Sequence, residues 1–257
     1  MNAAYTLSGF AVGAIVGLTG VGGGSLMTPL LVLLFGIPPA TAVGTDLLYA
    51  ALTKAGGTAA HAGNRTVDWR ITARLAAGSL PAAVLTLAAA WHFGFDRSAF
   101  SHVISASLGT ALLLTAAALL FKSRVQRFAL AHLSDAWHTR RIAPLTVAVG
   151  ALLGILVSLS SVGAGALGVT ALLFLYPTLP AVRIVGSDLA HAVPLTLVAG
   201  LGHWLLGNID WALLGALLLG SLPGIWLGSK LAVKLPERWL RSGLATLLIL
   251  IGGKLVF

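Results

Sequence analysis

Acidic, basic and imidazole side chains interrupt the apolar stretches of this sequence at only a few positions. Asp46 is followed fifteen residues later by His61, and the same spacing separates Asp188 from His203. At 3.6 residues per turn, this spacing places the acid and the imidazole about 60° apart around one helix. Carboxyl and imidazole groups inside a membrane mark proton and ion pathways, so these four residues are our candidates for proton coupling.

Each of these residues also has a structural interpretation. Asp46 and Asp188 lie in the first turn of the expected spans, where they would compensate the helix dipole with Thr45 and Ser187 as N-caps. Because a first turn lies near the membrane interface, its position favours capping over proton transfer for the aspartates. The two histidines are equally consistent with a proton relay and with hydrogen-bonded side chains at the interface.

Two glycine-rich segments, 20–25 and 160–165, are candidates for an anion site. Glycine allows the tight break that ends one helix and opens another. The N-terminus of the second helix then offers free N–H groups and a partial positive charge, which suits an anion. The alternative is close helix packing through small residues. The candidate ligands in these segments are Gly22, Gly23, Gly24, Ser25, Ser160, Ser161, Gly163 and Gly165.

Lys54 lies near the middle of the expected span 42–62. A charge there costs at least ~2.5 kcal/mol on insertion scales, so we expect Lys54 to face a partner or a cavity rather than lipid. From mid-span, the lysine side chain of about 6 Å is too short to reach the membrane surface, because half of the hydrocarbon core is about 15 Å thick. Two interpretations remain: positive charge for an anion pathway, or structural pairing with an acid.

These residues must be positioned by membrane-spanning helices. The chain has 257 residues, of which 58% are hydrophobic and 9% are charged, and its mean hydropathy is +0.96. A typical soluble domain is about a quarter charged, so an ordinary soluble fold is excluded. There is no cysteine, hence no disulfide framework and no thiolate metal site. We expect an all-α, polytopic helical membrane protein with one transmembrane domain over residues 1–257.

The helices and their orientation follow from the apolar segments and the basic residues. Segments 25–35 and 164–176 are too short to cross comfortably and are expected to be half-helices or re-entrant pieces. With the polar linker 122–142 in the cytoplasm, the basic loops fall on that side and both termini are periplasmic. Of the sixteen Lys and Arg residues, Lys54, Arg97 and Lys254 are the exceptions. The apolar segments are 4–20, 25–35, 42–62, 70–93, 99–121, 143–160, 164–176, 184–206, 211–232 and 240–257.

The sequence repeats itself at an offset close to 142 residues, with a first repeat at 4–121 and a second at 143–257. Asp68 and Asp210 are one matched pair, and each opens a span as an expected N-cap. Each half contains an odd net number of crossings, so we predict inverted repeats, which are typical of secondary transporters. Matching segments are 44–47 with 186–189, 67–69 with 209–211, and 78–81 with 220–223.

The motifs carried by these repeats resemble those of the sulfite exporter TauE/SafE family of membrane proteins. The resemblance rests on segments 20–29, 42–47 and 67–70, and on 208–211 and Gly220-Ser221 in the second half. It implies export or uptake of small anions, often sulfite, sulfonates or other sulfur compounds. The second half departs from the first, because Ala164 replaces the middle glycine of the break and Thr170 stands where the first half has Pro29.

We therefore predict a secondary transporter for a small anion in the bacterial inner membrane. No nucleotide-binding loop is present, which leaves the proton gradient as the expected energy source. The expected partners are a small anion and the lipid bilayer. We expect no nucleic acid partner, because the basic residues lie in short loops. Nor do we expect a cofactor or a metal, because no ligand cluster has a suitable spacing. The alternatives are an intramembrane enzyme that acts on a lipid, and uptake rather than export; the oligomeric state is open.

Overall fold

The protein is all-helical, as its composition predicted. The computed structural model describes residues 3–19, 24–92, 97–132, 135–232 and 237–256, and over these residues it contains ten helices and no strand. They are α1 (Ala3–Thr19), α2 (Gly24–Leu33), α3 (Pro39–Gly63), α4 (Trp69–His92), α5 (Arg97–His132), α6 (Asp135–Ser160), α7 (Ala166–Leu175), α8 (Ala181–Leu205), α9 (Trp211–Ala232) and α10 (Glu237–Val256).

Two of the helices, the second and the seventh, are much shorter than the others. Helices α2 and α7 have 10 residues each, which gives about 15 Å, half of a hydrocarbon core of about 30 Å. Within the described residues, five helices carry a stretch long and apolar enough to cross a membrane. These stretches are Trp69–His92, Ser101–Ala131, Arg141–Ser160, Ala181–Leu205 and Trp211–Gly228. The protein is therefore a multi-pass membrane protein.

Residues 122–132 and 135–142 are helical, so the described part of the segment expected to be a polar linker is not an irregular loop. Helix α5 continues to His132, and α6 begins at Asp135. No glycine or proline lies between Lys122 and His132 to end the helix. The charges of this segment thus lie on helical extensions rather than in an irregular linker.

Helices α3 and α8 begin earlier than predicted, and this changes the place of both aspartates. Asp46 and Asp188 lie seven residues after the first residues of these helices, Pro39 and Ala181. The N-cap positions are held by Pro38 and Pro180, with no side-chain cap. The expectation of a capping role in the first turn is therefore wrong. Proline is compatible with a helix start, and nothing after it in either segment prevents the helix from beginning there.

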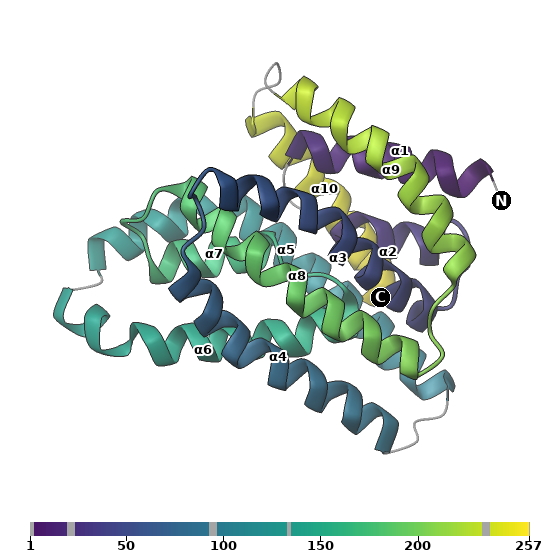
Figure 1. The fold of residues 1–257 in the computed structure, drawn as a ribbon, viewed down its shortest axis with the longest axis horizontal. Coiled ribbons are helices and arrows are strands. Elements are labelled where there is room, and N and C mark those ends of the chain that lie inside the picture. The colour runs from purple at the N-terminus through teal and green to yellow at the C-terminus, as the bar shows by residue number, and fades with distance from the viewer. Residues whose placement is uncertain (1–2, 20–23, 93–96, 133–134, 233–236, 257) are drawn as a thin grey trace.

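The two halves pack against each other in matched pairs of helices. Helix α3 packs on α8 at the centre, α1 runs along α9 on one side, and α4 runs along α6 on the other (Figure 1). Helix α10 packs on α5. Most of the first half of α3 is buried, so its polar residues lie inside the protein rather than against lipid.

Contacts between the halves are reciprocal. A Cβ atom on Gly78 would lie 2.8 Å from the backbone nitrogen of Ala151, and a Cβ atom on Gly220 would lie 2.8 Å from that of Phe10. These residues exchange places under the sequence repeat. Such reciprocity is the property of a two-fold relation. The opposite orientation of the halves in the bilayer stays a prediction.

Hydrogen bonds across the centre follow the same reciprocal pattern. The Asp210 N–H donates to Thr45 Oγ1 at 3.1 Å, and the Asp68 N–H donates to Ser187 Oγ at 2.8 Å. Thr45 and Ser187, predicted as caps of their own helices, thus hold the start of the helix from the other half.

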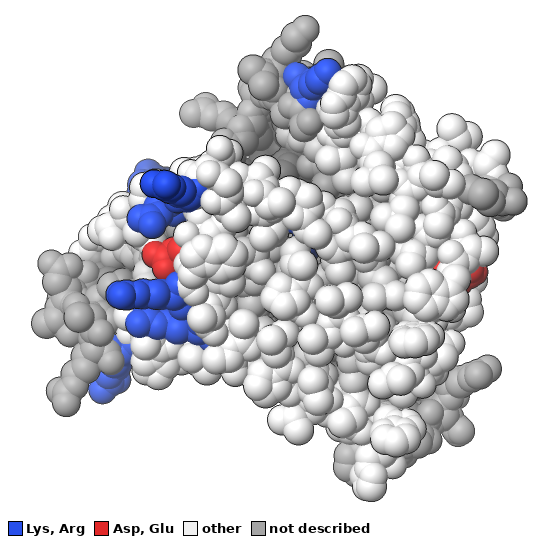
Figure 2. All heavy atoms as spheres, in the orientation of Figure 1, with Lys and Arg blue, Asp and Glu red and all other residues white. Residues whose placement is uncertain are grey.

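Basic side chains gather mostly at one edge of the face drawn in Figure 2, beside a broad uncharged surface. Arg74 Nη1 donates to the Tyr176 hydroxyl at 3.4 Å, and Gln126 Nε2 donates to the Pro177 carbonyl at 3.4 Å. These contacts join the start of α4, the end of α5 and the connection between α7 and α8. We predicted all three segments to be cytoplasmic, and they do lie on one side; which side of the membrane this is stays a prediction.

Candidate functional site

The break between α6 and α7 has an unusual backbone. Ser161, Gly163 and Gly165 have φ values of 59°, 126° and 134°, in the region that glycine tolerates best. Ser160 stabilises the break from within, since its Oγ donates to the Leu156 carbonyl at 2.6 Å and accepts from the Val162 N–H at 3.1 Å. Ser160, one of the three serines predicted as ligands, is thus engaged by the local backbone.

Lys54 reaches this break from α3. It is 6% exposed, and its Nζ donates to the carbonyl oxygen of Ala164 at 2.9 Å. The prediction that Lys54 faces a partner rather than lipid is confirmed. Its ammonium group also interacts electrostatically with Asp188 and Asp46. One buried cation thus interacts with two carboxylates, one from each half of the protein.

The Asp46 carboxylate joins α3 to α2 and to the break. Its Oδ2 accepts hydrogen bonds from the Thr28 hydroxyl and, at 2.9 Å, from Ser161 Oγ. The side chain is fully buried, and its Oδ1 has no hydrogen-bond partner among the described residues. Ser161, a predicted ligand residue, is therefore held by this carboxylate.

The Asp188 carboxylate occupies the matching place at the start of α7. The backbone N–H of Gly165 interacts with it, and a Cβ atom on Gly168 would lie 2.9 Å from its Cγ. Only a glycine at position 168 leaves room for the carboxylate in this position. Asp188 is 2% exposed, and its Oδ1 has no partner within the described part of the chain. The N-terminus of this half-helix thus faces a carboxylate of the protein itself.

The first glycine break is covered only in part. Gly22 and Gly23 lie outside the described residues, and so does the side chain of Ser25. Gly24 is the first residue of α2. The prediction that the two half-helix starts face each other across an anion stays a prediction.

The two predicted histidines lie in different surroundings. His61, near the end of α3, has its Nδ1 2.8 Å from Thr66 Oγ1. His203, near the end of α8, is fully buried, and its Nε2 donates to the Ser158 carbonyl at 2.8 Å. Both side chains are hydrogen-bonded to residues of the fold, which is the structural interpretation offered for them.

Sequence reasoning missed a second buried histidine. His191 is fully buried on α8, three residues after Asp188, and its Nε2 lies 2.7 Å from Ser79 Oγ. It interacts electrostatically with Lys54. Its repeat mate, at an offset of 142 residues, is Tyr49, which is also fully buried. The sequence did carry a signal, because an imidazole inside an apolar span is costly unless it has a role.

The buried cluster combines charge with unsatisfied polar atoms. Within the described residues, Asp46 Oδ1, Asp188 Oδ1, His191 Nδ1 and the Tyr49 hydroxyl have no hydrogen-bond partner. Buried polar atoms left in this state cost free energy, and a polar ligand would satisfy them. With both carboxylates and Lys54 ionised, the cluster carries one net negative charge. It can therefore take up a proton, and Lys54 can attract an anion.

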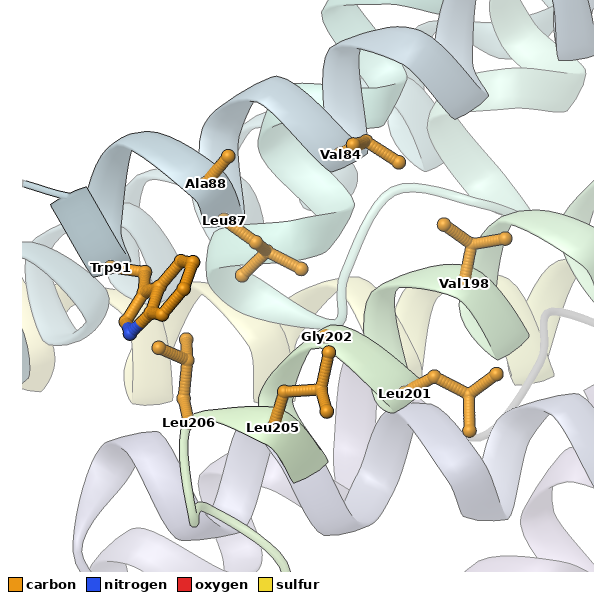
Figure 3. A pocket seen from close by; sticks show the side chains of 9 residues that line it. All are labelled: Val84, Leu87, Ala88, Trp91, Val198, Leu201, Gly202, Leu205 and Leu206. Carbon is orange, nitrogen blue, oxygen red and sulfur yellow. The ribbon is translucent and has the colours of Figure 1, made fainter.

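A separate hollow of about 470 Å³ lies between α4 and α8, away from this cluster (Figure 3). All its lining side chains are apolar, and Trp91 and Leu205 are 77% and 84% exposed. An apolar, outward-facing hollow suits lipid rather than an anion. The lining residues are Val84, Leu87, Ala88, Trp91, Val198, Leu201, Gly202, Leu205 and Leu206.

Comparison with known proteins gives one family. The profile of the family described as Sulfite exporter TauE/SafE matches residues 5–255. The chain is 36% identical over 213 residues to a "Probable membrane transporter protein YjnA" of Bacillus subtilis (strain 168), covering 83% of each chain. It is 40% identical over 70 residues to "Probable membrane transporter protein YunE" of the same organism, covering 27% of this chain and 26% of the relative. No solved structure matches significantly.

Proposed function

We propose that this chain, which belongs to the sulfite exporter TauE/SafE family of membrane transporters, carries a small anion across the bacterial inner membrane with proton coupling. The anions proposed are sulfite, organosulfonates and related sulfur-containing anions. The observation that carries the proposal is the buried Lys54 ammonium group at the glycine break, which interacts electrostatically with Asp46, Asp188 and His191. Each of these three side chains has a buried polar atom without a hydrogen-bond partner among the described residues.

Lys54 supplies the attraction for the anion. A cation in the membrane interior is retained only where it has a role or a partner. The Ala164 carbonyl provides one hydrogen bond, and an ammonium group has three N–H donors. An oxyanion of sulfur offers several acceptor oxygens to the remaining donors. The electrostatic attraction is stronger here than at the surface because Lys54 is buried.

The carboxylates of Asp46 and Asp188 supply the coupling. With both ionised, the net negative charge of the cluster opposes the entry of an anion. One proton on either carboxylate brings the charge of the cluster to zero, so that proton binding and anion binding favour each other. His61 and His203 are weaker candidates, because hydrogen bonds within the fold already engage both side chains.

The membrane orientation belongs to the same proposal. The basic residues at the start of α4 and along the α5 extension lie at the edge proposed to be cytoplasmic, and both termini are then periplasmic. The two halves would present the cluster alternately to each side of the membrane, as inverted repeats do in secondary transporters.

The test is transport by the purified protein in proteoliposomes. Radiolabelled sulfite, sulfate, thiosulfate, sulfoacetate and carboxylates are supplied, with a proton gradient imposed in each direction. We expect saturable flux of at least one sulfur anion and acceleration by one direction of the gradient. Absence of flux for every anion would refute the transport proposal, and flux indifferent to the gradient would refute proton coupling.

Lys54→Met tests the residue that carries the proposal. Loss of a charge-assisted hydrogen bond should raise the half-saturating anion concentration about tenfold to a hundredfold. Lys254→Met is the matched control, because it removes an exposed lysine by the same chemical change. Unchanged half-saturation in Lys54→Met would show that Lys54 is not a ligand. If Lys54→Met fails to fold and Lys54→Arg restores folding but not anion binding, structural pairing is the better explanation.

A further inference from the structure

We infer that His191 is a second ligand for the anion, with its Nδ1–H donating to an anion oxygen while Ser79 holds the ring in this tautomer. The inference rests on the proposed function and extends it to a residue for which neither the repeat pattern nor the family motifs assigned a role. His191 and Lys54 then form a pair of donors, one neutral and one charged, from the two central helices α8 and α3.

The position of His191 places it with the charged cluster. It lies three residues after Asp188 on α8, a spacing that keeps two side chains on neighbouring faces of one helix. Its side chain is fully buried and within electrostatic reach of Lys54. Bulk solvent does not touch the imidazole, so its ring nitrogens need partners inside the protein, from its own residues or from a bound ligand.

The hydrogen bond to Ser79 fixes the tautomer. Ser79 Oγ is also fully buried, and within the described residues His191 Nε2 is its only hydrogen-bond partner. A buried hydroxyl hydrogen needs an acceptor, so Nε2 accepts it and carries no hydrogen. In the neutral imidazole, the hydrogen is then on Nδ1. This atom is buried and has no partner in the part of the chain that the structure describes.

His203, the other buried histidine of α8, has the opposite tautomer. Its Nε2 lies 2.8 Å from the Ser158 carbonyl oxygen, which can only accept, so the hydrogen of that ring is on Nε2. The two buried histidines of α8 therefore differ in the atom that donates. His203 uses its N–H to hold α6, whereas the N–H of His191 remains available to a ligand.

The repeat places a similar group in the first half. Tyr49, the repeat mate of His191, lies near Ser221, the mate of Ser79, but without a well-formed hydrogen bond. Its hydroxyl is buried and has no partner among the described residues. A phenol hydroxyl and an imidazole N–H can both donate a hydrogen bond, so both halves of the repeat carry a buried donor at this position.

Two substitutions separate a ligand role from a structural role. In His191→Asn the amide nitrogen lies at the depth of Nδ1 and retains a donor there, but it loses the contact with Ser79. In His191→Gln the amide nitrogen lies at the depth of Nε2, so the Ser79 contact is retained and the donor is lost. We would measure radiolabelled sulfite flux in proteoliposomes for both variants, with His102→Gln as the control at an exposed histidine.

We expect His191→Gln to raise the half-saturating sulfite concentration about tenfold to a hundredfold with a smaller change in maximal rate. His191→Asn should stay closer to the wild type. The reverse order would overturn the inference, because it would mean that the Ser79 contact is what matters; so would equal affinity in both variants and the wild type.

A second measurement does not depend on transport. Nitrogen NMR of the histidine-labelled protein, assigned with the His191→Gln variant, reports which ring nitrogen carries the hydrogen. We expect a hydrogen on Nδ1, and a shift of that signal when sulfite is added. A hydrogen on Nε2 overturns the inference even where flux is normal. A wild type that moves no anion overturns the proposed function and this inference with it, whereas normal flux with the wrong tautomer overturns only the inference.

Discussion

Gly168→Ala is the substitution that most directly perturbs the Asp188 carboxylate without removing any functional group. The added Cβ atom would lie 2.9 Å from Asp188 Cγ and closer still to Oδ1. Carbon atoms in ordinary contact are about 3.5–4.0 Å apart, so the carboxylate must move by at least ~0.6 Å. A movement of this size disturbs the interaction of the carboxylate with the Gly165 N–H at the start of α7.

The expected loss of transport efficiency follows from the weakened hydrogen bond between Gly165 and Asp188. A hydrogen bond to a charged group contributes about 1.5–3 kcal/mol, and 1.4 kcal/mol corresponds to about tenfold in an equilibrium constant. We therefore expect the transport efficiency of Gly168→Ala to fall about tenfold to a hundredfold. The fold should be retained, because alanine is favoured over glycine in a helix by up to about 1 kcal/mol and the displaced atoms belong to a side chain.

The assay compares radiolabelled sulfite flux and Tm with those of Gly215→Ala. At Gly215, on α9, an added Cβ atom meets nothing within 4 Å, so this control has the same gain in helix propensity without the contact. We expect a normal or raised Tm in both variants and a reduced flux in Gly168→Ala alone. Flux equal to that of the control would show that the position of the Asp188 carboxylate does not matter for transport.

Further predictions concern packing, topology and capping. Gly78→Ala should lower Tm in detergent, by the equivalent of about 1–3 kcal/mol, because the added Cβ atom overlaps the α6 backbone. The control Gly56→Ala should leave Tm unchanged, because its added Cβ atom meets nothing within 4 Å. Equal Tm values in the two variants would contradict this. Since the chain contains no cysteine, Arg127→Cys adds a single thiol, which should react with an impermeant thiol reagent from the cytoplasmic side only. A phosphatase fused at Phe257 should be active in the periplasm. The opposite results would reverse the topology. Asp210→Ala should destabilise the protein by about 1 kcal/mol in thermal unfolding through loss of the N-cap of α9, with transport unchanged, and a fall in flux at normal stability would indicate a functional role instead.

The sequence alone determined the helical elements and their repetition. Apolar segments of the right length identify membrane helices irrespective of what surrounds them, since lipid forces the backbone to satisfy its own hydrogen bonds. The Asp68 and Asp210 caps were equally readable, because capping depends on neighbours along the chain; both side chains accept N–H groups of the helices that they open. Lys54 was also found, because a charge inside an apolar span is costly and therefore conspicuous.

Helix boundaries near prolines were only partly determined. The start of α3 at Pro39, rather than near residue 42, moved Asp46 from the first turn into the buried part of the helix. The α5 extension to His132 was missed for a related reason, since a polar composition describes a surface but does not end a helix. In both cases the local pattern indicated polarity correctly and the conformation incorrectly.

Only the tertiary structure decided which polar atoms meet. Lys54 and its carbonyl partner Ala164 are 110 positions apart, and Ser161 and Asp46 are 115 positions apart. His191 is a candidate ligand only because its Nδ1 is buried without a partner among the described residues. Periodicity defines the faces of each helix, but the rotation and depth at which two helices pack depend on how glycines and side chains of both fit together. These long-range fits decide which carboxylate, ammonium and imidazole groups share one buried site, and no local pattern contains them.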